Sequence, residues 1–259
     1  MAADHGASGC PLGWPLGPSA PSLGPDEVHV WLVALATSAA CRAGLEGLLD
    51  ADERARATRL RLPHARERFV VAHGALRDVL ARYVGARAAS LRFALGAMGK
   101  PTLARPPATG ISFNLAHSGD VAMLAVSRRA AVGIDVEELR DATPVEAIAT
   151  RFFSPAEIEG LNALPAAERQ ARFFTLWAAK EAYVKALGDS VWQRLPSVRV
   201  LLPPEAAVPT LVDGKRSVAT EWTLTLVDPG VSAAAALVVV GPSCTLACWR
   251  WEPAAIPSR

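Results

Sequence analysis

The chain has few cysteines, and their spacing is irregular. The four cysteines, Cys10, Cys41, Cys244 and Cys248, form no CxxC pair and have no histidine cluster beside them. Neither a zinc site nor a disulfide framework is indicated, and we expect buried or incidental thiols. With 259 residues, of which 51% are apolar, the chain can build one large domain or two small ones.

The chain also has few lysines and a small net charge. Of 27 basic residues only four are lysines, Lys100, Lys180, Lys185 and Lys215, and the others are arginines. A compact ammonium group suits a single phosphate oxygen, so these lysines are candidate phosphate ligands. The net charge of +2 argues against a nucleic acid as the partner.

Long apolar runs are missing as well. No stretch approaches the roughly 18 continuous apolar residues of a membrane span, so we expect no membrane contact. The first 25 residues have neither the basic start nor the apolar block of a signal peptide. Their frequent prolines and glycines are unfavourable for a helix. We therefore predict a disordered extension over residues 1–27 and a cytoplasmic protein.

The apolar pattern predicts short strands mixed with helices. Strands are expected at residues 28–35, 91–95, 111–115, 121–127, 131–137, 198–202, 222–227, 233–240 and 244–251. Helices are expected at residues 49–62, after Pro63, at 143–151, after Ser154, and before Gly188. A hairpin is predicted across residues 128–130. Many short strands mixed with helices favour an α+β protein over a doubly wound sheet. The order strand, helices, strands occurs twice, divided near residue 130.

The predicted helix over residues 173–188 carries its charges on one face. Apolar side chains recur at helical spacing, as Phe173, Phe174, Trp177 and Val184. Lys180, Glu181 and Lys185 form the polar side. A salt bridge between residues four positions apart would make this an ordinary solvated surface. Alternatively, Glu181 offers a carboxylate to a metal ion and the lysines contact phosphate. The helix alone leaves both interpretations open.

Asp135 and Glu137 lie on one face of the predicted strand, because side chains alternate along a strand. Two residue rises separate them by about 6.6 Å, so both carboxylates can converge on one hard cation. Neighbouring carboxylates repel each other unless a positive charge lies between them, and Mg²⁺ prefers such oxygen ligands. The alternative is a solvent-facing edge strand, where charged residues are common.

Two other charged features have a simpler structural interpretation. Ser154-Pro155-Ala156-Glu157 predicts a helix start with a capping box, so we expect Glu157 to be a helix cap, and a role as catalytic proton acceptor is the alternative. Residues 42–87 contain ten arginines and six acidic residues. This modest basic patch is typical of solvated helix surface.

Three motifs stand in one order: GIDVE at 133–137, RFFS at 151–154 and WAAKEAYVK at 177–185. Together they resemble the 4′-phosphopantetheinyl transferase superfamily, in particular its Sfp-type subgroup. Upstream, GKP at 99–101 and FNLAHSG at 113–119 resemble two further family segments. The resemblance covers roughly residues 28–250. It implies transfer of 4′-phosphopantetheine from coenzyme A to a serine of an apo carrier protein, with release of 3′,5′-ADP.

The resemblance also implies a fold and a cofactor. Two similar α+β halves, residues 28–130 and 131–259, would form an intramolecular pseudo-dimer that acts as a monomer. Coenzyme A and Mg²⁺ would bind in the cleft between the halves. Asp135, Glu137 and Glu181 would hold the metal, and Glu181, Lys185 and Asp135 would be the catalytic residues. The carrier would belong to a non-ribosomal peptide, polyketide or fatty acid synthase.

By the same resemblance, coenzyme A contacts fall on several residues. Lys180 and Lys185 would meet the pyrophosphate. The nucleotide end of coenzyme A would be held by Arg56, Arg68, Lys100 and His117. The GKP and FNLAHSG segments also contribute Pro101 and Asn114. Two positions depart from the family pattern: Ala116 replaces a serine, so we expect weaker coenzyme binding, and Glu53 replaces a lysine, with Arg54 and Arg56 as substitutes.

Two other functions remain open at this point. A carrier-protein binding module could keep the fold without the chemistry, although both acids and both lysines of the motifs are present. A Mg²⁺-dependent phosphohydrolase could use the same carboxylates, although no water-activating histidine or second metal cluster is evident in the sequence.

Overall fold

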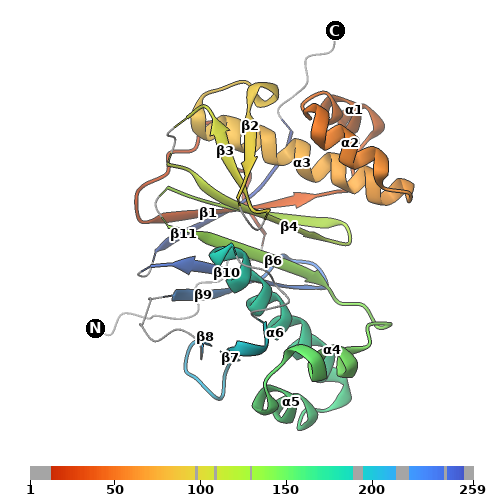
Figure 1. Cartoon of the computed structure of the whole chain (residues 1–259), viewed down its shortest axis with the longest axis vertical. Helices are drawn as coiled ribbons and strands as arrows, with labels where there is room; N and C mark the ends of the chain where they lie inside the picture. The colour runs from red at the N-terminus through yellow and green to blue at the C-terminus, as the bar shows by residue number, and fades with distance from the viewer. Residues whose placement is uncertain are drawn as a thin grey trace.

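Two β-sheets lie face to face in the middle of the molecule, and helices cover the outer face of each (Figure 1). The computed structural model describes residues 13–96, 99–107, 110–128, 130–188, 195–213, 222–241 and 244–253. No helix within these ranges is long and apolar enough to cross a membrane. The predicted α+β class is confirmed.

The first sheet has the strand order β11 (Thr245–Arg250), β1 (Glu27–Ala34), β5 (Val121–Ser127) and β4 (Ser112–Ser118). The pairing of β1 with β11 is parallel, and the other pairings are antiparallel. Its helices are α1 (Ala39–Glu46), α2 (Ala51–Arg59) and α3 (Pro63–Val84). A separate hairpin joins β2 (Arg92–Leu95) and β3 (Pro101–Arg105).

The second sheet has the order β6 (Val132–Glu138), β10 (Ala233–Val240) and β9 (Trp222–Val227), all antiparallel. Its helices are α4 (Val145–Phe152), α5 (Pro155–Asn162) and α6 (Ala166–Leu187). A two-stranded sheet of β7 (Val198–Leu201) and β8 (Thr210–Asp213) completes this part.

Three apolar clusters hold these layers together. One lies between α3 and the first sheet, and another lies between α6 and the second sheet. The third lies between the two sheets, where Val30 and Met123 meet Ile134 and Leu237. Alternation along β1 and β6 explains this arrangement, because successive side chains point to opposite faces of a strand. Each sheet is therefore buried on both faces.

Several predicted elements are confirmed, and one connection is wrong. The structure contains each of the strands predicted from the apolar pattern, and α5 has the expected capping box at Ser154 and Glu157. The predicted hairpin across residues 128–130 does not form. β5 pairs with β1 and β4, whereas β6 pairs with β10, so the chain crosses here from one sheet to the other.

The sequence did not predict which sheet contains the last strand of the chain. β11 lies in the stretch assigned to the second half, yet it pairs with β1 of the first sheet. The division at residue 130 therefore stays a prediction. Cys41 and Cys244 are free thiols, whereas Cys248 is disulfide-bonded, so the expectation of thiols alone is wrong for Cys248.

The predicted disorder of residues 1–27 is wrong for residues 13–27, and residues 1–12 lie outside the described ranges. Trp14 is buried in the cluster between the sheets. Its indole nitrogen donates to the carbonyl oxygen of Asp228 at 2.9 Å. Gly17 donates its backbone N–H to Arg250 at 3.0 Å. One large apolar side chain thus outweighs the local excess of proline and glycine.

This packing predicts a stability effect. Trp14→Ala should lower the free energy of unfolding by about 3 kcal/mol, because it removes a buried ring from the core. Leu16→Ala is the matched control: Leu16 is 53% exposed, so its replacement should change stability by less than about 0.5 kcal/mol. Denaturant unfolding measures both, and equal midpoints for the two variants would contradict the packing described.

Candidate active site

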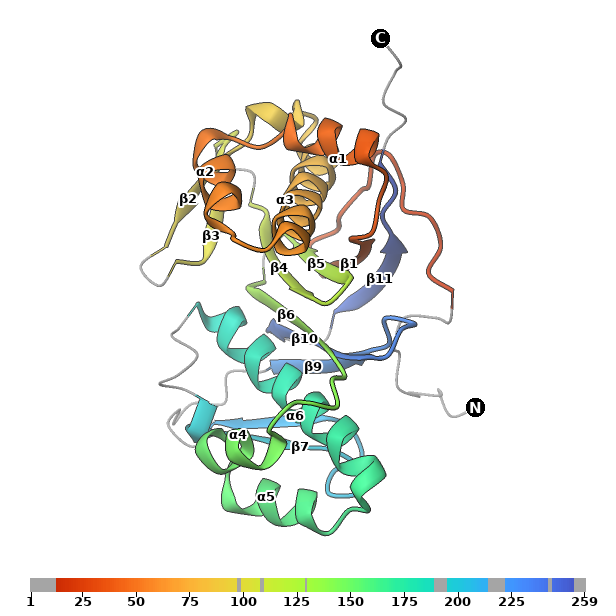
Figure 2. The ribbon, with the colours of Figure 1, turned by 90° about the vertical axis from the view of Figure 1, so that its right-hand side faces the viewer.

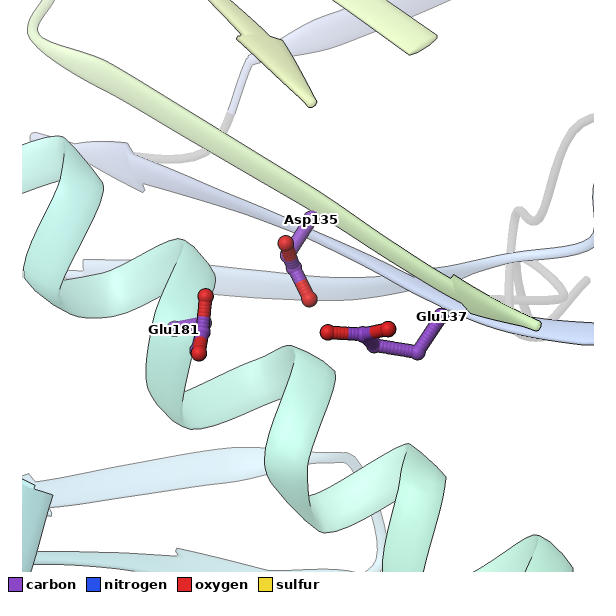
Figure 3. A group of neighbouring side chains, drawn as sticks. All are labelled: Asp135, Glu137 and Glu181. Carbon is purple, nitrogen blue, oxygen red and sulfur yellow. The ribbon is translucent and has the colours of Figure 1, made fainter. Parts of the chain in front are cut away.

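Three carboxylates converge between β6 and α6. Asp135 and Glu137 extend from the strand, and Glu181 faces them from the helix (Figure 3). One oxygen atom from each lies within 4.8 Å of the others. The predicted metal ligands are therefore together, and the alternative of a solvent-facing edge strand is excluded because Asp135 is only 2% exposed.

Gly133 explains how the helix comes so close to the strand. A Cβ atom at this position would lie 1.9 Å from the carbonyl oxygen of Ala182 and 2.3 Å from the backbone nitrogen of Ala186. Real side chains do not tolerate such contacts, so only glycine permits the backbone of α6 to rest on β6. Because Glu181 precedes Ala182 on the helix, this contact sets its distance from Asp135.

The charges of the cluster are not balanced within it. Burial raises the pKa of Asp135 to about 8, against the opposing effect of Lys185. Burial also raises the pKa of Glu137, against a hydrogen bond from Ser118. One oxygen of Asp135, Oδ2, is buried without a hydrogen-bond partner. Buried oxygens without partners are rare, and three carboxylates with a free oxygen fit a hard divalent cation.

Lys185 supplies the positive charge nearest to the cluster. Its ammonium contacts Asp135 Oδ1 and lies 3.3 Å from Glu181 Oε2. Burial lowers the pKa of Lys185, but the two carboxylates outweigh burial and raise the pKa above its usual value. The i,i+4 salt bridge expected on this helix is therefore present, and it is part of the acidic cluster rather than an alternative to it.

A cavity of about 670 Å³ opens beside the carboxylates. Glu137 reaches it from the acidic cluster, and the predicted nucleotide ligands Arg56, Arg68 and His117 line it. Its other lining residues are Arg59, Leu60, His64, Ala65, Phe69, His73, Ser118, Gly119 and Arg140. Burial lowers the pKa of His117, with further lowering by nearby cationic groups. The cavity thus joins a basic wall to an acidic end.

Ser118 and His73 are site residues that the sequence did not reveal. Ser118 Oγ donates to Glu137 at 3.0 Å and accepts from the backbone N–H of Glu138 at 3.1 Å, so it orients one of the three carboxylates. His73 stacks on Phe69 with ring centroids 4.0 Å apart. Ser118 lies in the FNLAHSG segment, which was a usable signal, whereas His73 lies in no motif.

Lys180 does not reach the site, which corrects its predicted contact with pyrophosphate. Its side chain is fully buried and its ammonium lies 2.8 Å from Glu157. It also donates to the carbonyl oxygens of Phe152 at 3.1 Å and Leu195 at 3.3 Å. On a helix, adjacent residues project about 100° apart. Lys180 therefore points into the second core while Glu181 points to the carboxylates.

Glu157 is a structural residue in this arrangement. Its Oε2 accepts from the backbone N–H of Ser154 at 2.7 Å, and its Oε1 accepts from that of Val200 at 2.9 Å. Together with Lys180, these contacts occupy both carboxylate oxygens. The predicted cap is present, and it also anchors α6.

Three other predicted coenzyme ligands lie outside the cavity. The ammonium of Lys100 donates to the carbonyl oxygens of Val132, Lys185 and Ala186, and burial lowers its pKa to about 8. Asn114 accepts from the backbone N–H of Ile134 at 2.8 Å. Pro101 begins β3.

Ala116, one of the two positions that depart from the family pattern, is buried in the core. It packs in the cluster between the sheets rather than lining the cavity. Its side chain therefore lies away from the predicted phosphate contacts.

The site and fold agree with the comparisons with known proteins. The family model of the 4′-phosphopantetheinyl transferase superfamily matches residues 131–238. This match, together with the similarity to HetI described next, shows that the chain is an enzyme of the phosphopantetheine-transferring class and belongs to that superfamily, as the motifs predicted.

Two relatives show how far the similarity extends. The chain is 36% identical over 229 residues to the 4′-phosphopantetheinyl transferase HetI of Nostoc sp., which covers 88% of this chain and 91% of HetI. It is 30% identical over 220 residues to a phosphopantetheinyl transferase of Thraustochytrium sp., covering 79% of this chain and 76% of that protein. The similarity thus includes both sheets.

The buried pair of Lys180 and Glu157 predicts a specific pattern of stability. Glu157→Gln should lower the free energy of unfolding by about 3 kcal/mol, because Lys180 is left as an uncompensated buried charge. Adding Lys180→Met should recover part of this loss. Glu159→Gln, an exposed change on the same helix, should have almost no effect.

Thermal unfolding together with a turnover assay checks this assignment. If Glu157→Gln abolished turnover while leaving the melting temperature unchanged, Glu157 would be a catalytic group and its structural role would be refuted.

Proposed function

We propose that the chain transfers 4′-phosphopantetheine from coenzyme A to a serine of an apo carrier protein or carrier domain, with Mg²⁺ as cofactor. The observation that carries the proposal is the convergence of Asp135, Glu137 and Glu181 beside a basic cavity. Membership of the superfamily supports the reaction. The location we propose is the cytoplasm, where coenzyme A and carrier proteins are available.

The basic wall of the cavity is proposed to bind the nucleotide end of coenzyme A. Arg56, Arg68 and His117 line that wall, and guanidinium groups pair well with phosphate oxygens. Arg68 already holds a carboxylate, Asp120, at 2.8 Å. The diphosphate would then extend towards Glu137, the point at which the cavity meets the acidic cluster.

Asp135, Glu137 and Glu181 are proposed to hold the metal. Bound there, Mg²⁺ would supply Lewis-acid stabilisation of the charge that develops on the leaving nucleotide. Asp135 Oδ2 is the free oxygen for this purpose, and Ser118 keeps Glu137 oriented.

Glu181 and Lys185 are proposed as the groups that act on the reacting atoms. Glu181, directly or through a water, would accept the proton from the attacking serine hydroxyl. General-base assistance of this kind typically contributes about 10²- to 10⁴-fold. The ammonium of Lys185 would move from its carboxylate partners towards the diphosphate, where a fixed positive charge stabilises the transition state.

Mass spectrometry of the acceptor tests the function directly. With apo carrier protein, coenzyme A and Mg²⁺, the wild-type chain should add one phosphopantetheine to the carrier. Glu181→Gln should abolish this gain, because it removes a metal ligand and the proton acceptor. Tight carrier binding without any mass gain would indicate a binding module. Phosphate release without a mass gain would indicate a phosphohydrolase.

The raised pKa of Asp135 predicts a pH-dependent effect of the metal. Its folded-state pKa of about 8 lies above the ordinary value of 3.8, so the folded protein binds this proton more tightly than the unfolded chain does. Raising the pH through this range therefore removes stability from the metal-free protein. Because Mg²⁺ competes with the proton, the stabilisation by Mg²⁺ should grow from about pH 6 to about pH 8.

Melting temperatures with Mg²⁺ or with a chelator measure this difference. Asp135→Asn is the control, since it retains the shape of the side chain but removes the titrating charge. A stabilisation by Mg²⁺ that is the same at both pH values would contradict the prediction.

A further inference from the structure

Arg59, the last residue of α2, and the three residues that connect α2 to α3, Leu60-Arg61-Leu62, are all exposed, and we call these four residues the α2–α3 corner. Neither Arg59 nor Arg61 forms an ion pair with any residue in the described part of the chain. The next arginines along α3 differ: Arg66 lies 3.1 Å from Glu46, and Arg68 is paired as well. The corner therefore presents two guanidinium groups that the fold does not neutralise.

The same corner exposes two leucines. Leu60 is 37% exposed and Leu62 is 57% exposed. A single exposed leucine needs no explanation. Here the two leucines alternate with two unpaired arginines within four residues, which gives a small apolar surface between positive charges. Arginine together with apolar contact area is typical of protein interfaces.

The position of the corner connects it to the site. Arg59 and Leu60 line the cavity that also contains Glu137, so the corner forms part of the rim of that cavity. Figure 2 looks onto this side of the molecule, with α2 and α3 above and α6 below. Arg61 and Leu62 are not among the residues that line the cavity, so they are available to a molecule that approaches from outside.

The charge balance indicates what such a molecule carries. Residues 54–68 contain six arginines and one acidic residue, Glu67, although the whole chain has a net charge of only +2. An acidic protein surface gains most from this patch, because opposite potentials steer association. Leucines between the arginines favour a partner with an apolar side chain among its carboxylates over a nucleic acid backbone.

We propose that the α2–α3 corner is the docking surface for the acceptor protein, through an acidic patch with an apolar side chain beside the acceptor serine. This inference rests on the proposed function. Docking at the rim would place the serine over the opening of the cavity, near the three carboxylates. Arg61 would pair with the acidic patch, and Leu62 would contact its apolar side chain.

Steady-state kinetics with the full chain test the proposal. Arg61→Glu should raise the KM for the apo carrier about fivefold. It should leave kcat and the KM for coenzyme A unchanged, since Arg61 lies outside the cavity. Leu62→Ser should also raise the KM for the carrier. Added salt should weaken carrier binding to the wild type and to Leu62→Ser, and have less effect on Arg61→Glu.

Arg199→Glu is the matched control. Arg199 is an exposed arginine on β7, and its reversal should leave the KM for the carrier unchanged. Equal carrier KM values for Arg61→Glu, Leu62→Ser and wild type would overturn the proposed docking surface. Transfer by the wild type in the same experiment would still support the proposed function. An absence of transfer by the wild type would overturn both. Analytical sedimentation gives the last test. If the wild type is a dimer that Arg61→Glu dissociates, the corner binds a second copy of the chain and the proposal is overturned.

Discussion

The backbone of α6 rests directly on β6, and Gly133 leaves no side chain between them. This contact fixes the distance between the helix and the strand, and the three carboxylates depend on that distance. Asp135 and Glu137 follow Gly133 at alternate positions, so strand geometry points both towards the helix. Glu181 lies next to the helix residue that Gly133 touches. A single position without a side chain thus sets the geometry of a site whose strand ligands and helix ligand lie more than forty residues apart in the sequence.

The two lysines on α6 have different charged partners in different surroundings. Lys180 lies in a fully buried pair with Glu157, with further bonds to two carbonyl oxygens, and this pair fixes the rotation of the helix about its axis. Lys185 lies beside the carboxylates, where its ammonium contacts Asp135 and Glu181. The first lysine therefore belongs to the core, and the second belongs to the acidic cluster of the site. Removing one charge from a buried pair leaves the other uncompensated, so the pair of Lys180 and Glu157 matters for stability.

Much of the fold and the centre of the site could be predicted from the sequence. Periodicity located the strands of both sheets, because each is apolar on its buried faces, and alternation placed Asp135 and Glu137 side by side. The side of a helix to which each residue points was harder to predict from the sequence. The KE pair of residues 180 and 181 reads as one motif, but its members point to different sides, and the partner of Lys180 lies far upstream at Glu157. Lys100 and Asn114 belong to motifs, yet their polar atoms bind backbone groups of β6 and α6. Such long-range hydrogen bonds leave no local pattern in the sequence.

The parallel pairing of β11 with β1 has a consequence for how the cleft can respond to ligands. The last strand returns from the second sheet to the first, so the first sheet contains strands from both ends of the described chain. The chain therefore crosses between the sheets twice, from β5 to β6 and from β10 to β11, and separating the sheets would expose the apolar core between them. The packed core thus holds the cavity beside Glu137 in shape before any ligand arrives, and the entropy of assembling that cavity is lost during folding rather than during binding. Adaptation to different acceptors is left to side chains at the rim.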